Sequence, residues 1–378
     1  MRILIIKLGS LGDIIHTLPA AALLRRSFPE ACISWVADSR SSAILKTCPA
    51  IDQLIELDTR AWNSAPLQRR TMKDLLSRLS ELKGDTITAA AQERRTAAGS
   101  GQRELPGGPA DIAIDFQGLI KSGVIALASR ARTRVGCETS DLREKASRVF
   151  LTEQAATAHE PHIIGKNIAL ARAVATRYAN GSTQPEPSAS ASFYDFPICL
   201  TDRDEGYAKE LAETVGVDFA ILNPGSAWQT KLWAPDRYAE LSDWLGAEYG
   251  IRSLVTYGPG EEKLAMDVVS ASKSSAARAV GPNLQQFVAL ARRAALFVGP
   301  DTGPLHLAAA CGTPIVGLYG PTSPSRNGPF QSRDVTVARD LWCRSECHRR
   351  RCWHWECMDI SVAAVKEAVL IRLAEPRA

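Results

Sequence analysis

Short apolar runs alternate with amphipathic segments along most of the chain. An apolar run of about four to eight residues is typical of a strand buried on both faces, as in a parallel sheet. The runs that we interpret as such strands are residues 2–7, 33–37, 53–57, 111–116, 218–222, 253–257, 295–298 and 314–319. Helical patterns separate them, and this alternation predicts an α/β fold with doubly wound parallel sheets.

Two strand-to-helix turns carry polar groups directly after an apolar run. Residues 8–13, Leu-Gly-Ser-Leu-Gly-Asp, follow the first predicted strand. Residues 299–306, Gly-Pro-Asp-Thr-Gly-Pro-Leu-His, follow the strand predicted at 295–298. Open parallel sheets bind ligands at the carboxyl ends of their strands. The pattern therefore predicts a ligand-binding edge near each end of the chain, and two such edges facing each other would form a cleft.

The length of 378 residues exceeds one ordinary hydrophobic core, so we expect two domains of similar size. We expect the first at 1–180, a linker rich in Pro, Ser and Gly at 181–196, and the second at 197–378. Residues 84–110 lack periodicity, and we interpret them as a mobile surface insertion without a role in the chemistry.

The composition indicates a globular enzyme, with 45% hydrophobic and 23% charged residues. No apolar stretch reaches the roughly 18 residues of a transmembrane helix, and the first strand does not resemble a secretory signal. We therefore expect a cytoplasmic protein. The net charge of +4 permits an anionic partner but is too small to indicate a nucleic-acid binder, so no nucleic acid is expected.

Asp13 and the turn at 299–306 offer two kinds of chemistry. Asp13 is either a helix N-cap or a general base that accepts a proton from a bound hydroxyl. The amides of Thr302 and Gly303 would hold a diphosphate at a helix start, unless Asp301 or Thr302 merely caps that helix. His306, one turn later, is either a catalyst or a packed polar residue.

Two other loops present charged groups. Lys231, with the hydroxyl of Ser226, would neutralise a diphosphate leaving group without a metal, and the alternative is a solvated lysine. Glu261 and Glu262 follow a Gly-rich turn and would accept ribose hydroxyls, although acidic residues are common at helix starts.

A late segment is rich in cysteine and histidine. Four cysteines and two histidines within it would bind zinc tetrahedrally, although their spacing is not that of common zinc ribbons. The alternative is a set of reduced, partly buried thiols. The residues are Cys343, Cys347, Cys352 and Cys357, with His348 and His354 among them. No metal is expected at the reaction centre.

Segments 7–19, 115–122, 223–233, 301–312 and 319–322 together resemble glycosyltransferase family 9, and most closely its lipopolysaccharide heptosyltransferases of type I. The resemblance implies the GT-B architecture, two Rossmann-like domains facing across a cleft. It also implies an inverting, metal-independent transfer of heptose from ADP-L-glycero-β-D-manno-heptose to the Kdo of a lipid A precursor such as Kdo2-lipid A. Such an enzyme would work as a peripheral protein at the inner face of the inner membrane.

The resemblance assigns roles to single residues. Asp13 falls on the catalytic base of the family. Positions that match donor contacts are Ser226, Lys231, Glu261, Glu262, Asp301, Thr302, Gly303 and His306. Positions that match acceptor contacts are Gly12, Arg60, Lys121 and Arg143. Basic residues that would help docking to an anionic membrane surface are Arg69, Arg70, Arg130, Arg132 and Arg134.

The sequence departs from type I enzymes in two places, at Ala227, where a second hydroxyl is common, and in the cysteine-rich segment. Two alternatives therefore stay open. The chain is another family 9 transferase, such as heptosyltransferase II or a core or O-antigen enzyme, or it is a nucleotide-sugar binding protein without turnover.

Overall fold

The computed structural model describes residues 1–59, 77–78, 80–82, 107–157, 160–179, 194–215, 218–343, 347 and 349–376. The chain divides into two compact units, Met1–Cys199 and Leu200–Ala378. Each unit is built on a six-stranded sheet. Residues 84–106 of the predicted insertion and 181–193 of the predicted linker lie outside the described residues. Within the described part, no helix has the length and apolar character needed to cross a membrane.

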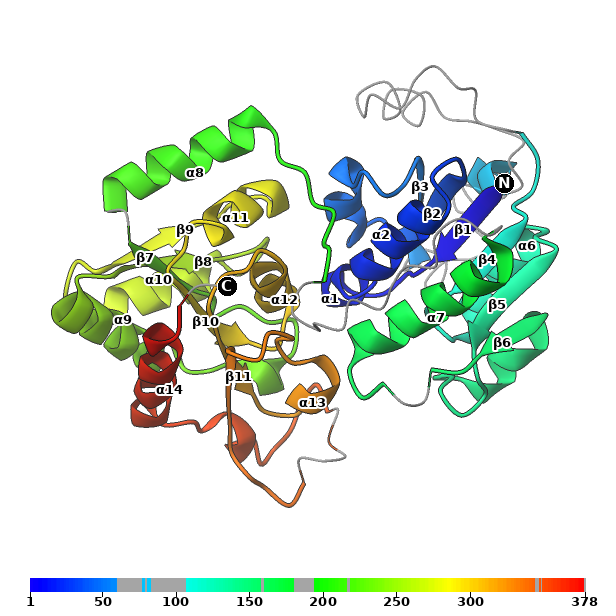
Figure 1. Ribbon diagram of the computed structural model, residues 1–378. Helices are drawn as coiled ribbons and strands as arrows, with labels where there is room; N and C mark the ends of the chain where they lie inside the picture. The colour runs from blue at the N-terminus through cyan, green and yellow to red at the C-terminus, as the bar shows by residue number, and fades with distance from the viewer. Residues whose placement is uncertain are drawn as a thin grey trace. The chain divides into compact units, whose positions relative to one another are not determined.

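The first sheet has the order β3-β2-β1-β4-β5-β6, and all its strand pairs are parallel. Its strands are β1 (Arg2–Ile6), β2 (Cys32–Asp38), β3 (Gln53–Leu57), β4 (Ile112–Asp115), β5 (Thr133–Cys137) and β6 (Glu153–Ala155). The helices are α1 (Leu11–Ile15), α2 (Leu18–Ser27), η1 (Ser42–Thr47), α6 (Ile120–Ala128), η2 (Lys145–Phe150) and α7 (Ile163–Tyr178). Figure 1 shows α2 lying along α7, and α6 packs on η2.

The second sheet has the order β12-β11-β10-β7-β8-β9 and is also parallel throughout. Its strands are β7 (Phe219–Leu222), β8 (Arg252–Thr256), β9 (Ala277–Val280), β10 (Leu296–Pro300), β11 (Ile315–Tyr319) and β12 (Val335–Ala338). Helix α9 (Pro235–Tyr249) packs against α10 (Glu262–Ala271) and α14 (Val362–Ala374). Helix α11 (Leu284–Ala291) packs against α8 (Asp202–Val215) and α12 (Gly303–Ala310). The remaining short helices are η3 (Gln229–Lys231), α13 (Pro324–Asn327) and η5 (Glu356–Met358).

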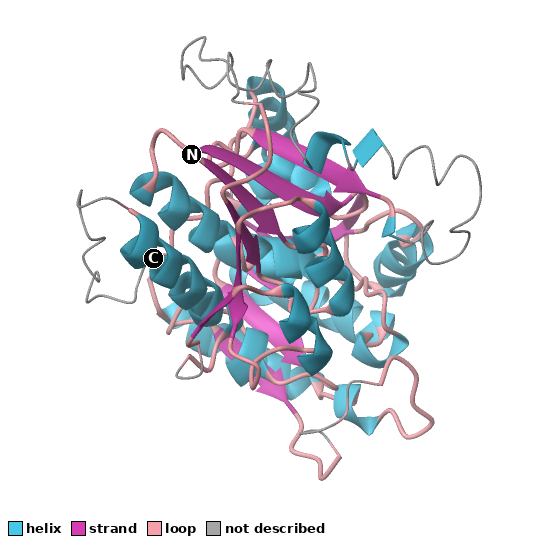
Figure 2. Ribbon diagram, turned by 90° about the vertical axis from the view of Figure 1, so that its right-hand side faces the viewer, coloured by secondary structure: helices cyan, strands magenta, loops and turns pink. Residues whose placement is uncertain are grey.

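Both sheets have the same doubly wound order, since the second repeats the pattern 3-2-1-4-5-6 of the first in its own strand numbering. Helices lie on both faces of the strands, as Figure 2 shows. In such a sheet the chain leaves the two central strands in opposite directions, which opens a ligand crevice at their carboxyl ends. These switch points lie between β1 and β4 in the first unit, and between β7 and β10 in the second.

All eight predicted strands are present, with ends that differ by at most two residues from those expected. The strands that the pattern missed are β5, β6, β9 and β12. Strands β6, β9 and β12 are edge strands with partly exposed side chains, and β5, next to the edge, contains Arg134, so none forms a continuous apolar run.

Candidate functional site

Asp13 lies at the switch point of the first sheet, on the short helix α1 that follows β1. Its carboxylate accepts hydrogen bonds from the backbone N–H and the hydroxyl of Ser10, both at 2.9 Å. Ser10 is the N-cap residue of α1 and Asp13 is the third residue of the helix, so Asp13 is not the N-cap; its carboxylate instead closes a capping box by accepting from the Ser10 N–H. A Cβ atom on Gly9 would lie 2.3 Å from the Asp13 Oδ2 atom. The Gly9 position therefore has to be glycine for this carboxylate to fold back over the loop.

Lys7, the first residue after β1, supplies the opposite charge. Its side chain is buried, its Nζ atom donates to the Phe116 carbonyl at 2.7 Å, and it lies 4.0 Å from Asp13 Oδ1. Burial alone would raise the pKa of Asp13, but the Lys7 charge and the hydrogen bonds from Ser10 outweigh it and hold this pKa below its ordinary value. Asp13 is therefore ionised at neutral pH, the protonation state that a general base requires.

The loop after β4 completes this end of the sheet. The buried Asp115 carboxylate accepts from the N–H groups of Gln117 and Gly118, at 2.8 and 3.1 Å, and from the Ser122 hydroxyl at 2.9 Å. The Gln117 side chain in turn accepts from the Leu8 N–H at 3.2 Å. These bonds tie the loops after β1 and β4 together, so the position of Asp13 depends on both strands.

The predicted acceptor residues differ in their placement. Arg143 is exposed, and its charge acts on both Lys7 and Asp13, so it belongs to the same edge. Lys121 is exposed near the start of α6, and Gly12 is buried in α1. Arg60 lies outside the described residues.

Asp301 is the centre of the corresponding edge in the second unit. Its Oδ1 atom forms hydrogen bonds with His306 Nε2 and Asn327 Nδ2, both at 2.9 Å. Its Oδ2 atom accepts hydrogen bonds from Lys231 Nζ and the Thr322 hydroxyl, both at 2.7 Å. An ionised carboxylate has about four acceptor positions, so this one is filled. Burial would raise the pKa of Asp301, but His306 and Lys231 hold it well below its ordinary value.

Lys231 is held rigidly rather than solvated, which excludes the alternative given above. Its ammonium group also donates to the Asp301 carbonyl at 2.7 Å and lies over the Trp228 ring, 4.7 Å from the ring centre. An ammonium has three N–H donors, so one is left for a ligand after these two oxygen contacts with Asp301. Ser226 lies in the same loop, where its hydroxyl accepts from the Trp228 N–H at 3.1 Å.

Helix α12 begins at the same edge, directly after Asp301. Thr302 is its N-cap residue, and its hydroxyl donates to the Pro300 carbonyl at 3.3 Å. Gly303 is the first helical residue, followed by Pro304. The first N–H groups of a helix have no partner within it, so the amides of Thr302 and Gly303 form a surface suited to an anion.

Glu261 and Glu262 lie beside this edge, at the start of α10. The Glu261 carboxylate accepts from the Gly258 N–H at 3.0 Å. A Cβ atom on Gly225 would lie 2.2 Å from Glu261 Oε2, so this carboxylate packs directly on the loop that contains Ser226. The Glu262 side chain is exposed.

Several residues of these edges had no role predicted from the sequence. Lys7 and Asp115 carried a signal, since each is a charged residue at the end of an apolar run. Thr322 and Asn327 follow the neighbouring strand β11, and nothing in their local sequence connects them with Asp301. Their role emerges only from the order of the strands.

The chain is similar to known glycosyltransferases in sequence and in fold. The sequence model of glycosyltransferase family 9 (heptosyltransferase) matches residues 100–354. Lipopolysaccharide heptosyltransferase 1 of Pseudomonas aeruginosa is 25% identical over 93% of this chain and 87% of its own length. The enzyme of the same description from Escherichia coli is 26% identical over 87% of this chain and 91% of its own length.

Two solved structures share the fold. The structure of E. coli heptosyltransferase WaaC with ADP has a TM-score of 0.74 and 22% identity, and covers 98% of this chain and 99% of that one. The E. coli ADP-heptose heptosyltransferase II has a TM-score of 0.68 and 20% identity, with 99% of both chains covered. The family model alone spans more than half of the chain. The two doubly wound units, each with polar residues at its switch point, are consistent with this match. The chain therefore belongs to glycosyltransferase family 9.

Proposed function

We propose that this enzyme transfers heptose from ADP-L-glycero-β-D-manno-heptose to the Kdo of the lipopolysaccharide inner core. The observation that carries the proposal is the Lys231–Asp301 pair beside the start of α12, because it fixes a lysine ammonium at the crevice where an α/β sheet binds nucleotides. Support for the sugar comes from the relatives, whose descriptions name heptosyltransferase 1.

In this proposal the second unit binds the donor. The free donor of Lys231, the Ser226 hydroxyl and the amides of Thr302 and Gly303 bind the diphosphate and stabilise the charge that develops on departing ADP. The dipole of α12 adds only about 0.3 to 1 kcal/mol for an exposed charge, so the directed hydrogen bonds contribute most of the stabilisation. Glu261, with Glu262 beside it, accepts hydrogen bonds from hydroxyl groups of the ribose or heptose.

Asp301 and His306 act in this proposal as positioning residues. Because the Asp301 carboxylate is filled by four side chains, it orients Lys231 and does not itself contact the donor. His306 is buried and holds the other oxygen of the same carboxylate. Both residues therefore influence donor binding through the direction of the Lys231 ammonium.

Asp13 is the proposed base. Its carboxylate takes the proton of the acceptor hydroxyl while that oxygen attacks the anomeric carbon, in a single displacement that inverts the configuration. The carboxylate is about one third exposed, with 31% of its side chain accessible, so a hydroxyl can reach it. The encounter of Asp13 with a donor held by the second unit is part of the proposal.

Basic groups near Asp13 suit an acidic acceptor. Arg143 and Lys121 are exposed and would bind the carboxylates or phosphates of the Kdo region, with Gly12 and Arg60 as further contacts. The proposed place of action is the inner face of the inner membrane. Of the arginines expected to dock on the membrane, Arg69 and Arg70 lie outside the described residues. Arg134 donates a hydrogen bond to the Phe150 carbonyl at 2.6 Å.

The test is mass spectrometry of the products formed from ADP-heptose with each of two acceptors, Kdo2-lipid A and a core that already carries heptose. We expect one heptose to be added to Kdo2-lipid A, a rate unchanged by added Mg²⁺, and a much slower addition by an Asp13→Asn variant. Transfer only to the heptosylated core would instead assign the type II reaction. ADP-heptose binding with no transfer to either acceptor would refute the proposed reaction.

A further inference from the structure

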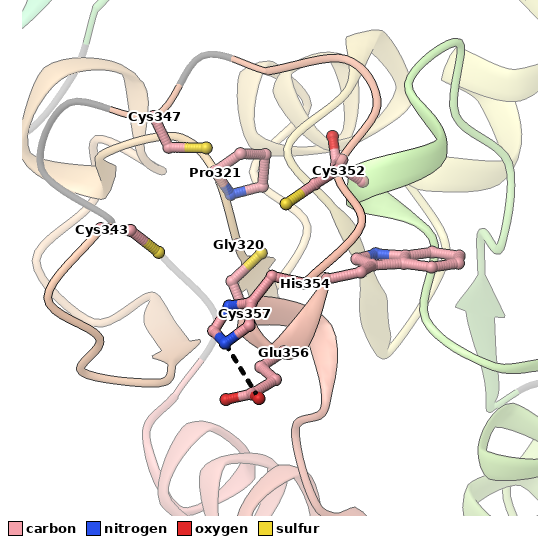
Figure 3. A pocket seen from close by; sticks show the side chains of 10 residues that line it. Gly320, Pro321, Cys343, Cys347, Cys352, His354, Glu356 and Cys357 are labelled. Carbon is pink, nitrogen blue, oxygen red and sulfur yellow. Dashed lines mark ion pairs between the residues drawn. The ribbon is translucent and has the colours of Figure 1, made fainter.

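The four cysteines of the late segment line a single pocket. Cys343, Cys347, Cys352 and Cys357 surround it together with His354 and Glu356, and Figure 3 shows the four side chains on different sides of the pocket. All nine cysteines of the chain are free thiols, and these four are half-buried. No part of the proposed transfer reaction uses them.

Two backbone N–H groups are directed at the Cys352 sulfur atom. The backbone N–H groups of His354 and Trp355 donate to its sulfur atom, in a tight turn where Trp355 has a positive φ of 21°. A neutral thiol accepts hydrogen bonds only weakly, whereas a metal-bound thiolate is oriented and stabilised by such second-shell donors. The turn thus presents two donors to one of the four sulfur atoms that line the pocket.

The segment between β12 and α14 buries little apolar surface among its described residues. Its described residues include the 3-10 turn η5, and Trp342 and Trp353 are 87% and 89% exposed. Of the residues described in this segment, only Met358 and Ile360, at its end, are buried in the core of the second unit. A segment that buries so little apolar surface is typical of structures that rely on a bound metal or a cross-link.

We propose that Cys343, Cys347, Cys352 and Cys357 bind one divalent transition-metal ion as thiolates, with zinc as the occupant. Four sulfur ligands in tetrahedral arrangement suit zinc, and a closed set of four protein ligands makes the site structural. His354 is paired with Glu356 at 3.1 Å and stays outside the ligand set. The complex would carry a net charge of about −2, which the exposed Arg349, Arg350 and Arg351 offset.

The side chains have to turn inward to bind the ion. As the structure stands, its described residues include no group of three or more Cys, His, Asp or Glu side chains close enough for one metal. The described residues around the four cysteines form turns and one short 3-10 helix, so the proposal requires rotation of these side chains and small loop shifts to bring the sulfurs together.

The metal would also steady the donor side of the second unit. The Thr230 hydroxyl donates to the Arg349 carbonyl at 2.7 Å, and the Arg350 guanidinium lies 5.5 Å from the centre of the Trp228 ring. The opposite end of the segment packs on the turn before Thr322, where a Cβ atom on Gly320 would lie 3.1 Å from the Cys357 sulfur. The cysteine-rich segment therefore contacts both loops that position Asp301 and Lys231.

The experiment is metal analysis of the purified full-length protein by inductively coupled plasma mass spectrometry, without substrate. We expect about one zinc ion per chain in the wild type and less than about 0.1 in Cys352→Ser, because loss of one thiolate opens a closed structural site. Cys199→Ser, a change at an exposed cysteine outside the segment, is the matched control and keeps the metal.

Cobalt substitution of the wild type gives a second readout that needs no variant. A chelated protein that takes up one Co²⁺ with intense thiolate charge-transfer absorption would support the four-sulfur site, and about one iron per chain lost in Cys352→Ser would support it with another ion. Wild-type protein without bound metal that also fails to bind Co²⁺ would overturn the proposal. So would a Cys352→Ser variant that retains its metal. Neither result depends on transfer activity.

Discussion

Replacement of Asp301 by Asn removes the charge at the centre of the donor edge. Asp301 and Lys231 expose 3% and 12% of their side chains, so the change leaves an ammonium group almost buried without its counter-charge. Removal of one partner from a buried ion pair costs about 3 to 5 kcal/mol. Asn is isosteric with Asp, so the lower end of that range is expected, with a Tm decrease of about 6 to 12 °C for a unit of this size.

The assay is thermal unfolding followed by tryptophan fluorescence. Six of the eight tryptophans belong to the second unit, so the signal reports mainly on the part that contains the substitution. Asp267→Asn is the matched control, because Asp267 and its partner Lys263 are 46% and 87% exposed. An exposed pair of this kind contributes at most about 1 kcal/mol and is often silent.

The effect also depends on pH. The folded-state pKa of Asp301 is lowered from its ordinary value of 3.8, so its stabilising contribution is complete above that value and is lost as the pH falls toward the folded-state pKa. The Tm difference between the wild type and Asp301→Asn should therefore be full at pH 7 and shrink below about pH 4. Equal Tm values for Asp301→Asn and Asp267→Asn at pH 7 would refute the reasoning.

Three further predictions concern the catalytic groups. Asp13→Asn should lower the transfer rate by about 10² to 10⁴ while calorimetric ADP-heptose binding is unchanged, and a near wild-type rate would remove the base assignment. Ser10→Ala removes a hydrogen bond to the ionised carboxylate, so the pKa of Asp13 should rise and the acid limb of the pH–rate profile should move to higher pH; an unmoved limb would contradict this. Gly225→Ala places a Cβ atom 2.2 Å from Glu261 Oε2 and should weaken ADP-heptose binding. Gly206→Ala, with no atom within 4 Å of the new Cβ, is the control and should leave binding unchanged. Equal affinities of the two variants would exclude Glu261 from the donor site.

The alternation of apolar and helical segments was enough to predict two parallel sheets and their central strands. Central strands are buried on both faces, so they need continuous apolar runs that are legible in the sequence. Edge strands such as β9 and β12 are half-exposed and lack that requirement, which is why they were missed. The ordered motifs around Asp13, Lys231 and Asp301 likewise indicated the family directly.

Local sequence was not sufficient to predict which charged groups meet at the two sheet edges. Lys7 meets the Phe116 carbonyl across 109 positions of the chain, and Lys231 meets Asp301 across 70. These residues become neighbours because the switch points place β1 beside β4 and β7 beside β10, strands that are not consecutive in the chain. The sequence by itself thus determined the sheets, the family and most of the candidate residues. Only the tertiary structure decided that Asp13 is held ionised and that Asp301 orients Lys231, because pKa and hydrogen-bond saturation depend on groups that strand order brings together.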